Sequence, residues 1–461
     1  MKPIRLLLSV LLAAACAPRT PPPPALTDIR ASPTAVASST PVVIATQAAE
    51  PGETSTPAPT LAAPARSSQV DAETTARHRR IFEQVWNTVN AQYVYPDFNG
   101  VNWNAVYAEY GARVDLGLSD EEFWGTLAAM IDLLGDDHSS FLTPAEARRQ
   151  DNQLEGNLTY AGIGIYASAQ VDQQQAIVFV VFSGSPAEAA GLRAHDAILA
   201  INDQPVVNPD GTDNLDRLRG LPGTRVTLLV KSPGAAPREV SLPRARIDGA
   251  LRVSGRALVA EPDTRFGYML IPTLWDASIE SSARETLTEL MADGPLDGLI
   301  IDMRTNGGGT STNLLALLSI FTHGQRGEFV SRGEVRPLRL SADPIGNSQS
   351  VPLVILIGAA TESYAEVFSG VLLEAGRARL VGAHSAGNIE TVYGYDFEDG
   401  SRAWIARETF IPPSGDNWEK VGLAPSVRVD RAWDEFTEAD DPYLAAALEL
   451  LVPAAGASPL R

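Results

Sequence analysis

The sequence contains very little cysteine and very little lysine. Its 461 residues include one cysteine, Cys16, so a disulfide within the chain is excluded. Only three lysines occur: Lys2, Lys231 and Lys420. The formal net charge is −20, which argues against nucleic acid as a partner. The sequence has no phosphate-binding loop, nucleotide motif or metal-ligand cluster, so we expect neither a cofactor nor a metal.

The N-terminus lacks the long hydrophobic run of a membrane span but has the features of an export signal. Lys2 and Arg5 precede a short apolar segment, and small residues lead to Cys16. A cysteine in this place resembles a bacterial lipoprotein signal, in which it is lipidated and becomes the new N-terminus. An ordinary secretory signal with an incidental cysteine is the alternative. We expect an exported protein that Cys16 anchors to the outer face of the cytoplasmic membrane or on the periplasmic side.

The composition changes along the chain and predicts five segments. Residues 1–16 form the signal, and residues 17–69, rich in Pro, Thr, Ser and Ala, form a disordered tether. Apolar residues at helical spacing predict a helical domain over 70–150. Residues 155–246 are β-rich with short helices, and strands alternate with helices over 252–453, which predicts a mainly parallel α/β domain.

The β-rich segment carries a specific motif. Ser185-Pro-Ala-x-x-Ala-Gly-Leu192 is followed by Asp196-x-Ile198, with His195 where glycine is usual before that aspartate. The motif resembles a PDZ domain of bacterial proteases. The resemblance implies a groove for an extended peptide, with backbone amides that receive a terminal carboxylate. The groove residues it implies are Gly162, Ile163, Gly164 and Ile165; a rigid module without a ligand is the alternative.

A serine in the α/β segment stands where a buried strand meets a helix. The apolar run Val351–Ile357 predicts the strand, and Val367, Phe368, Val371 and Leu372 predict one face of the helix. Ser363, between them, would lie at the positive end of that helix, which favours an exposed and activated hydroxyl. A simple capping role for Ser363 is the alternative.

A run of glycines follows another buried strand, Gly298–Met303. The amides of such a turn can stabilise an oxyanion, and we expect Gly308 as one donor and Tyr364, directly after the serine, as the second. A tight turn without catalytic function is the alternative.

Together these motifs resemble the carboxyl-terminal processing peptidases and the related tricorn-like peptidases, over roughly residues 75 to 430. Gly298-Leu-Ile-Ile-Asp-Met-Arg-Thr-Asn-Gly-Gly-Gly309 is similar to the oxyanion strand of that family. Thr361-Glu-Ser363-Tyr-Ala-Glu366 is similar to its nucleophile turn. The resemblance implies a ClpP/crotonase-like α/β catalytic domain, an N-terminal helical segment and an inserted PDZ domain. It also implies a serine endopeptidase that cleaves polypeptides recognised through their C-termini.

One departure concerns the base. The processing peptidases use a lysine, and its position falls on Asn388, which cannot accept a proton from a hydroxyl. The tricorn-like branch uses histidine and glutamate instead, and its positions match His138 and Glu419. We therefore predict Ser363 as nucleophile, His138 as base and Glu419 as the orienting carboxylate, with His384 as the reserve base.

The missing lysine leaves a second function open. A catalytically inactive member could use the cleft or the PDZ groove to bind peptides or apolar ligands. The sequence specifies neither the substrate nor the oligomeric state.

Overall fold

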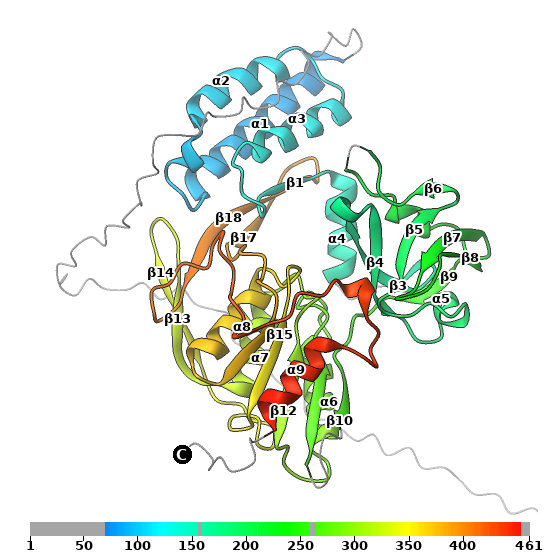
Figure 1. Cartoon of the computed structure of the whole chain (residues 1–461). Coiled ribbons are helices and arrows are strands. Elements are labelled where there is room, and N and C mark those ends of the chain that lie inside the picture. Colours follow the sequence, from blue (N-terminus) through cyan, green and yellow to red (C-terminus); the bar gives the residue numbers. More distant parts are fainter. Residues whose placement is uncertain (1–69, 155–158, 210, 259–263, 453–461) are drawn as a thin grey trace, which may run out of the picture. The chain divides into compact units, whose positions relative to one another are not determined.

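The computed structural model describes residues 70–154, 159–209, 211–258 and 264–452. The predicted signal with Cys16 and the predicted tether lie outside the described residues. The described chain contains a helical part, a β-rich part and an α/β part, in that order (Figure 1). The predicted fold class is confirmed.

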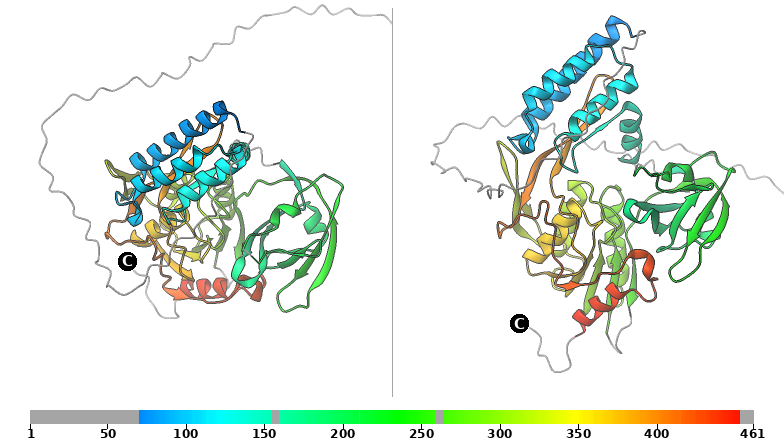
Figure 2. Two further views of the ribbon diagram at one scale, coloured as in Figure 1. Left: turned by 90° about the horizontal axis from the view of Figure 1, so that it is seen from above. Right: turned by 45° about the horizontal axis from the view of Figure 1, so that its top comes forward.

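Three helices form the N-terminal helical part and pack against one another (Figure 2). Asp71 begins the first helix by accepting a hydrogen bond from the Thr74 amide at 2.7 Å. Ser119 and Glu122 form a capping box at the start of the third. The elements are α1 (Ala72–Gln92), η1 (Phe98–Gly100), α2 (Trp103–Val114), α3 (Asp120–Asp132), β1 (Ser140–Leu142) and α4 (Pro144–Leu154).

The short strand β1 attaches this helical part to the α/β part of the chain. It pairs antiparallel with β18 (Arg402–Ile411), so that Phe141 lies opposite Ala403. Ala403 and Ile405 of β18 belong to the hydrophobic core of the helices. The loop that contains His138 directly precedes β1, so this pairing fixes the loop against β18.

The β-rich part forms a six-stranded sheet in the order β3-β4-β5-β7-β8, with β6 paired to β5, and a separate pair of β2 and β9. Ile163, Val178, Ile198 and Leu228 lie in its core. Its elements are β2 (Thr159–Gly162), β3 (Ile165–Gln170), η2 (Val171–Gln173), β4 (Gln175–Val181), α5 (Pro186–Ala189), β5 (Ala197–Ile201), β6 (Gln204–Pro205), η3 (Leu215–Leu218), β7 (Arg225–Lys231), β8 (Arg238–Pro243) and β9 (Ala245–Asp248).

A second six-stranded sheet, ordered β10-β11-β12-β15-β16-β19, forms the base of the α/β part. All of its neighbouring strands are parallel except β10 and β11. The strand predicted from Val351 begins at Leu353. The elements are β10 (Ser254–Leu258), β11 (Phe266–Leu270), α6 (Ile279–Leu290), β12 (Gly298–Asp302), α7 (Ser311–Phe321), β15 (Leu353–Ile357), α8 (Tyr364–Glu374), β16 (Ala378–Gly382), β19 (Val427–Arg428), η4 (Trp433–Glu435) and α9 (Pro442–Leu451).

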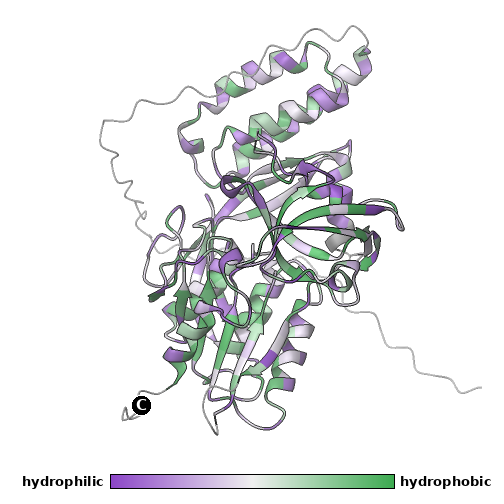
Figure 3. Ribbon diagram, turned by 45° about the vertical axis from the view of Figure 1, so that its right-hand side comes forward, coloured by the Kyte–Doolittle hydropathy of each residue, from purple (hydrophilic) through white to green (hydrophobic). Residues whose placement is uncertain are grey.

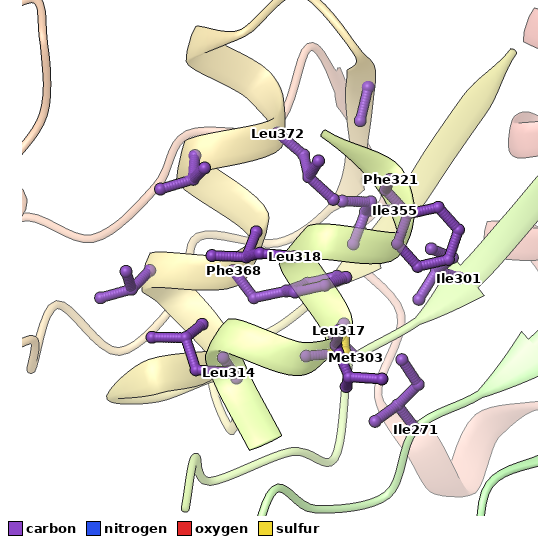
Figure 4. Close-up of a cluster of buried hydrophobic side chains, with 14 of the residues drawn as sticks. Ile271, Ile301, Met303, Leu314, Leu317, Leu318, Phe321, Ile355, Phe368 and Leu372 are labelled. Carbon is purple, nitrogen blue, oxygen red and sulfur yellow. The ribbon is translucent and has the colours of Figure 1, made fainter. Parts of the chain in front are cut away.

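Helices cover both faces of this sheet, which explains why its central strands are hydrophobic along their length (Figure 3). On one face, Phe368 and Leu372 of α8 pack with Leu314 and Phe321 of α7 (Figure 4). On the other face, α9 covers a separate cluster of buried residues. The serine at the start of α8 is therefore held by a packed core.

A further sheet has the strand order β1-β18-β13-β14, with β17 paired to β18. Its remaining strands are β13 (Gly324–Val330), β14 (Val335–Leu340) and β17 (Thr391–Asp396). Strand β17 begins directly after Asn388, Ile389 and Glu390. A turn that contains Asp399 and Gly400 connects β17 to β18.

Candidate active site

Ser363 occupies the junction between β15 and α8 in an unusual backbone conformation. Its φ of +57° and ψ of −129° are rare for a residue with a side chain, and such strain is of the order of 1–3 kcal/mol and is concentrated at functional sites. The Ser363 amide donates to the carbonyl of Asn388 at 2.9 Å. The hydroxyl therefore stands on a sharp turn at the positive end of a helix, as the sequence predicts.

The glycine turn after β12 lies against Ser363. A Cβ atom added to Gly308, which has a φ of +85°, would lie 2.7 Å from the Ser363 Cβ and 3.0 Å from its Oγ. The absence of a side chain at Gly308 therefore leaves room for the serine. The Gly308 amide donates to the Asn306 side-chain oxygen at 2.9 Å. An oxyanion bound to that amide would compete with Asn306.

Glu366 organises the loop that lies opposite the serine. Its buried carboxylate accepts hydrogen bonds from the Ser385 hydroxyl at 2.5 Å, the Gly387 amide at 2.8 Å and the Asn388 amide at 2.9 Å. Burial raises the pKa of Glu366, although these donors oppose the rise. The predicted lysine position, Asn388, is thus fixed beside Ser363, and its side-chain amide donates to Glu362 at 2.7 Å.

His138 reaches this loop from the helical part of the chain. Its Nδ1 lies 3.4 Å from Oε2 of Glu390, two residues after Asn388. The His138 side chain is 11% exposed, and that of Glu390 is fully buried. The Ala406 amide of β18 donates to the hydroxyl of Ser139 at 3.1 Å, which holds the His138 loop in place. The structure therefore brings an imidazole and a carboxylate to the loop whose Asn388 carbonyl accepts the Ser363 amide.

The sequence predicts Glu419 beside the imidazole. In the structure Glu390 contacts the imidazole, and Glu419 contacts Glu390. Oε2 of Glu419 accepts from the Ile389 amide at 2.9 Å, and its side chain interacts with that of Glu390. Glu390 also accepts a hydrogen bond from the Tyr95 hydroxyl at 3.0 Å. Sequence reasoning missed Glu390, although an acidic residue two positions after Asn388, where the lysine is missing, was a signal that could have found it.

The two carboxyl groups titrate very differently. Burial and the neighbouring Glu390 raise the pKa of Glu419 to about 9. Burial would raise the pKa of Glu390 too, but His138 and the Glu419 side chain hold it below its ordinary value. Near neutral pH, Glu419 therefore carries the shared proton and Glu390 carries the negative charge beside His138.

Comparison with known proteins shows which proteins the chain is similar to. The sequence profile of peptidase family S41 matches residues 265–429, that of the tricorn protease C1 domain residues 74–132, and that of the PDZ domain residues 152–231. The chain is 26% identical to the chloroplastic C-terminal processing peptidase of Tetradesmus obliquus, covering 79% of this chain and 80% of the relative. It is 28% identical to the carboxyl-terminal-processing protease of a Picosynechococcus species, covering 74% and 81%.

Over residues 265–429, the chain is similar to peptidase family S41. It is a serine-type peptidase of the carboxyl-terminal processing kind with a PDZ domain, and both predictions are confirmed. Its fold is similar to that of the photosystem II D1 C-terminal processing protease, with a TM-score of 0.56 and 24% identity over 77% of this chain and 93% of that one. An S41 protease structure from Bacteroides fragilis has the same TM-score at 15% identity, over 80% and 96%.

The PDZ domain opens into a cavity of about 930 Å³. Ile163 and Ile165, both predicted groove residues, line it together with Leu218 and Arg219. Gly162 ends β2, and Gly164 packs so tightly that an added Cβ would lie 2.2 Å from the Ser185 Cβ. The same cavity extends to Thr273 and Trp275 of the catalytic domain. Leu274, between them, donates its amide to the Gly308 carbonyl at 2.8 Å, so the segment that lines this end of the cavity is bonded to the glycine turn.

The structure also bears on the predicted reserve base, on metal ligands and on membrane-spanning helices. The reserve base His384 and Lys420 are both exposed, and the Lys420 backbone amide donates to the Gly387 carbonyl at 2.6 Å. Over the ranges that the structure describes, no cluster of His, Cys, Asp or Glu side chains could hold a metal ion. Within those same ranges, every helix is too short or too polar to cross a membrane.

Proposed function

We propose that this serine peptidase is an exported, membrane-tethered endopeptidase that cleaves polypeptides through an acyl-enzyme at Ser363. His138 acts as the base, Glu390 holds its ring, and Glu419 supports Glu390. The observation that carries the proposal is the contact between His138 and Glu390 in the loop that binds the Ser363 backbone. This pair supplies a proton acceptor and its carboxylate where the chain has asparagine in place of lysine.

In the proposed reaction, His138 accepts the proton of Ser363 and then donates it to the leaving group. The Ser363 Oγ attacks the scissile carbonyl carbon, and its proton passes to the His138 nitrogen that faces away from Glu390. The same proton then passes to the leaving nitrogen as the C–N bond breaks. A water molecule repeats both steps on the ester and frees the serine. The Tyr364 amide, and the Gly308 amide once it leaves Asn306, would donate to the oxyanion.

Substrate tails would enter through the cavity. Its wall combines apolar side chains with two arginines, Arg149 and Arg219, and two aspartates, Asp216 and Asp276. The Asp276 carboxylate already accepts hydrogen bonds from the Leu251 and Ser278 amides. An apolar C-terminal tail with a free carboxylate suits such a wall. The chain beyond the tail would then pass Trp275 on its way to Ser363.

A fluorophosphonate probe tests the nucleophile. It should label the wild-type protein and leave Ser363→Ala unlabelled, because only an activated serine is phosphonylated. Ser369→Ala is the matched control, since Ser369 lies buried on the same helix and donates to the Ala365 carbonyl at 2.8 Å. A wild-type protein that stays unlabelled over a wide pH range would contradict the proposal.

The Ser363→Ala protein also separates binding from cleavage. It should bind an apolar peptide with a free C-terminus at least tenfold more tightly than the same peptide with an amidated end. Equal affinity for both peptides would remove the C-terminal recognition. Tight binding without cleavage by the wild type would favour the ligand-binding function instead.

The anchor forms a separate part of the proposal and concerns residues outside the described ranges. Cys16→Ser should shift the protein from the membrane fraction to the soluble fraction of a bacterial host, because the lipidated thiol would be lost. Metabolic labelling with palmitate should fail in the same variant. Membrane association that persists without Cys16 would contradict the anchor and leave the peptidase unaffected.

A further inference from the structure

His195 of the PDZ domain stands in a backbone conformation that favours glycine. Its φ is +75°, in the left-handed region, where a residue with a side chain is less stable by roughly 1–2 kcal/mol. Glycine is the residue that the PDZ motif has at this position. The ring of His195 is nevertheless 2% exposed, so its contacts must offset the strain.

The buried ring contacts the C-terminal segment of the catalytic domain. It stacks on Trp433, with the ring centroids 4.4 Å apart and the planes at 12°. Its Nδ1 donates to the Trp433 carbonyl at 2.8 Å, which places the proton of the neutral ring on Nδ1. Phe179 of β4 meets Trp433 edge-on at 5.6 Å, and the Gln175 amide donates to Asp434 at 3.1 Å. Strands β4 and β5 of the PDZ domain are thus docked on η4.

The Trp433 ring also contacts a buried cation. The guanidinium carbon of Arg304 lies 4.5 Å from the Trp433 ring centroid. Trp433 therefore contacts both the imidazole and the guanidinium. Arg304 is itself fixed by ion pairs with Asp302 at 2.6 Å and Asp441 at 2.7 Å.

The contacts of His195, Trp433 and Arg304 reach the strand that leads to the active site. Asp302 is the last residue of β12, and the glycine turn follows Arg304 within a few residues. The Asn306 side chain accepts from the Gly308 amide and donates to the Ile271 carbonyl at 2.9 Å. The docked PDZ domain therefore contacts, through Trp433 and Arg304, the segment that lies against Ser363.

We propose that His195 and Trp433 are positioning residues: they dock the PDZ domain on the strand end that carries the glycine turn, and protonation of His195 releases the domain. The effect on peptide cleavage rests on the proposed function, whereas the docking does not. A released PDZ domain no longer aligns its cavity with Trp275. Polypeptide substrates then bind less well, while the serine itself stays reactive.

The charges around the ring favour release in acid. Burial lowers the pKa of His195, and Arg304 lowers it further, while the bond to the Trp433 carbonyl opposes both. Asp441 and Glu438 raise it to a smaller extent, and Asp440 also faces the ring. On the PDZ side, Asp196 accepts a hydrogen bond from the Arg193 amide. A cationic His195 would share one indole with the Arg304 cation.

The sign of the pH effect follows from the lowered pKa. The docked state binds the second proton more weakly than the released state does, so docking is at full strength above the ordinary histidine pKa of about 6.5. It weakens as the pH falls through the lowered pKa of the docked ring. Release is therefore expected on the acid side of neutrality.

Distance measurements between two spin labels test the docking. Cys16 is the only cysteine, so a full-length Cys16→Ser protein accepts Ala235→Cys in the PDZ domain and Glu289→Cys on α6, both exposed, without other labels. At about pH 8 we expect one narrow distance distribution, and at about pH 5 a broad distribution. Identical distributions at both pH values would overturn the proposal.

Two variants assign the effect to the stack. His195→Asn suits the left-handed backbone but removes the ring, and it should give the broad distribution at both pH values. Trp433→Leu should do the same from the other partner. His323→Asn changes an exposed histidine of the catalytic domain and should respond to pH as the wild type does. A His195→Asn protein that stays docked would contradict the proposal.

Kinetics separate positioning from a general loss of structure. His195→Asn should raise the KM for a tail-bearing polypeptide about tenfold, with kcat and the fluorophosphonate labelling rate within twofold of wild type. A fall in kcat alone would contradict the positioning role. Spin-label distances measured in Ser363→Ala do not depend on catalysis, so a failed docking and a failed peptidase function give different results.

Discussion

His138→Ala should lower kcat/KM for a polypeptide substrate by about 10³-fold, because the variant removes the proton acceptor of Ser363. Asn388 cannot replace it, and the exposed Lys420 offers no buried amine near the serine. Ser363 stays in place because its turn is held by Asn388 and the core of α8. Added imidazole should restore part of the activity, since it can enter the space left by the ring.

The second histidine that the sequence offers as a base provides the control. His384→Ala should retain activity within about twofold, because that side chain is exposed in the loop after β16. If His384→Ala is the inactive variant and His138→Ala is active, the reserve base is correct and the His138 assignment is wrong. Equal activity of both variants would point to a base that neither position supplies.

Glu390→Gln extends this prediction to the carboxylate. The amide has nearly the same shape but lacks the charge that stabilises the imidazolium as the proton arrives. We expect kcat to fall about 10²-fold and KM to change little, which a steady-state assay separates. Glu419→Gln should affect kcat less, because the structure places Glu390 and not Glu419 against His138. The reverse order of the two effects would restore the prediction made from the sequence.

The serine turn and its supporting strands could be predicted from the sequence because local signals determine them. A β-branched apolar run, small residues and a helical apolar face follow one another around Ser363. The same holds for Gly308, whose glycine is required by the 2.7 Å approach of the Ser363 Cβ. Each of these two segments carries its own local signal, although the contact between Gly308 and Ser363 joins residues far apart in the chain.

The partner of His138 could not be predicted in this way. The imidazole lies in the helical part, and both candidate carboxylates lie late in the catalytic domain. The pairing of β1 with β18 and the hydrogen bond from Ile389 to Glu419 decide which carboxylate meets the ring. Similarly, His195 reads as a minor departure from a motif until Trp433, far along the chain, is found against it.

Stability should fall as the pH rises from about 5 to about 9, and Glu419→Gln should remove much of that dependence. The pKa of Glu419 is raised to about 9 in the folded protein, whereas an unfolded chain ionises near 4.5. Between these values the folded state holds a proton that the unfolded state has released. The free energy of unfolding therefore decreases by up to about 1.4 kcal/mol per pH unit from this group.

The glutamine variant isolates that contribution. Its amide resembles the protonated carboxyl group and does not titrate, so urea unfolding at several pH values should give a flatter curve than in the wild type. Glu366, whose pKa is also raised, contributes equally to both proteins and cancels in the comparison. Glu390 acts in the opposite direction but only at more acid pH, because its pKa is lowered. Glu374→Gln, at an exposed position on α8, should follow the wild-type curve. Parallel curves for Glu419→Gln and the wild type would mean that the two buried carboxyl groups do not share a proton, and Glu390 would then lose the neighbour that keeps it charged beside His138.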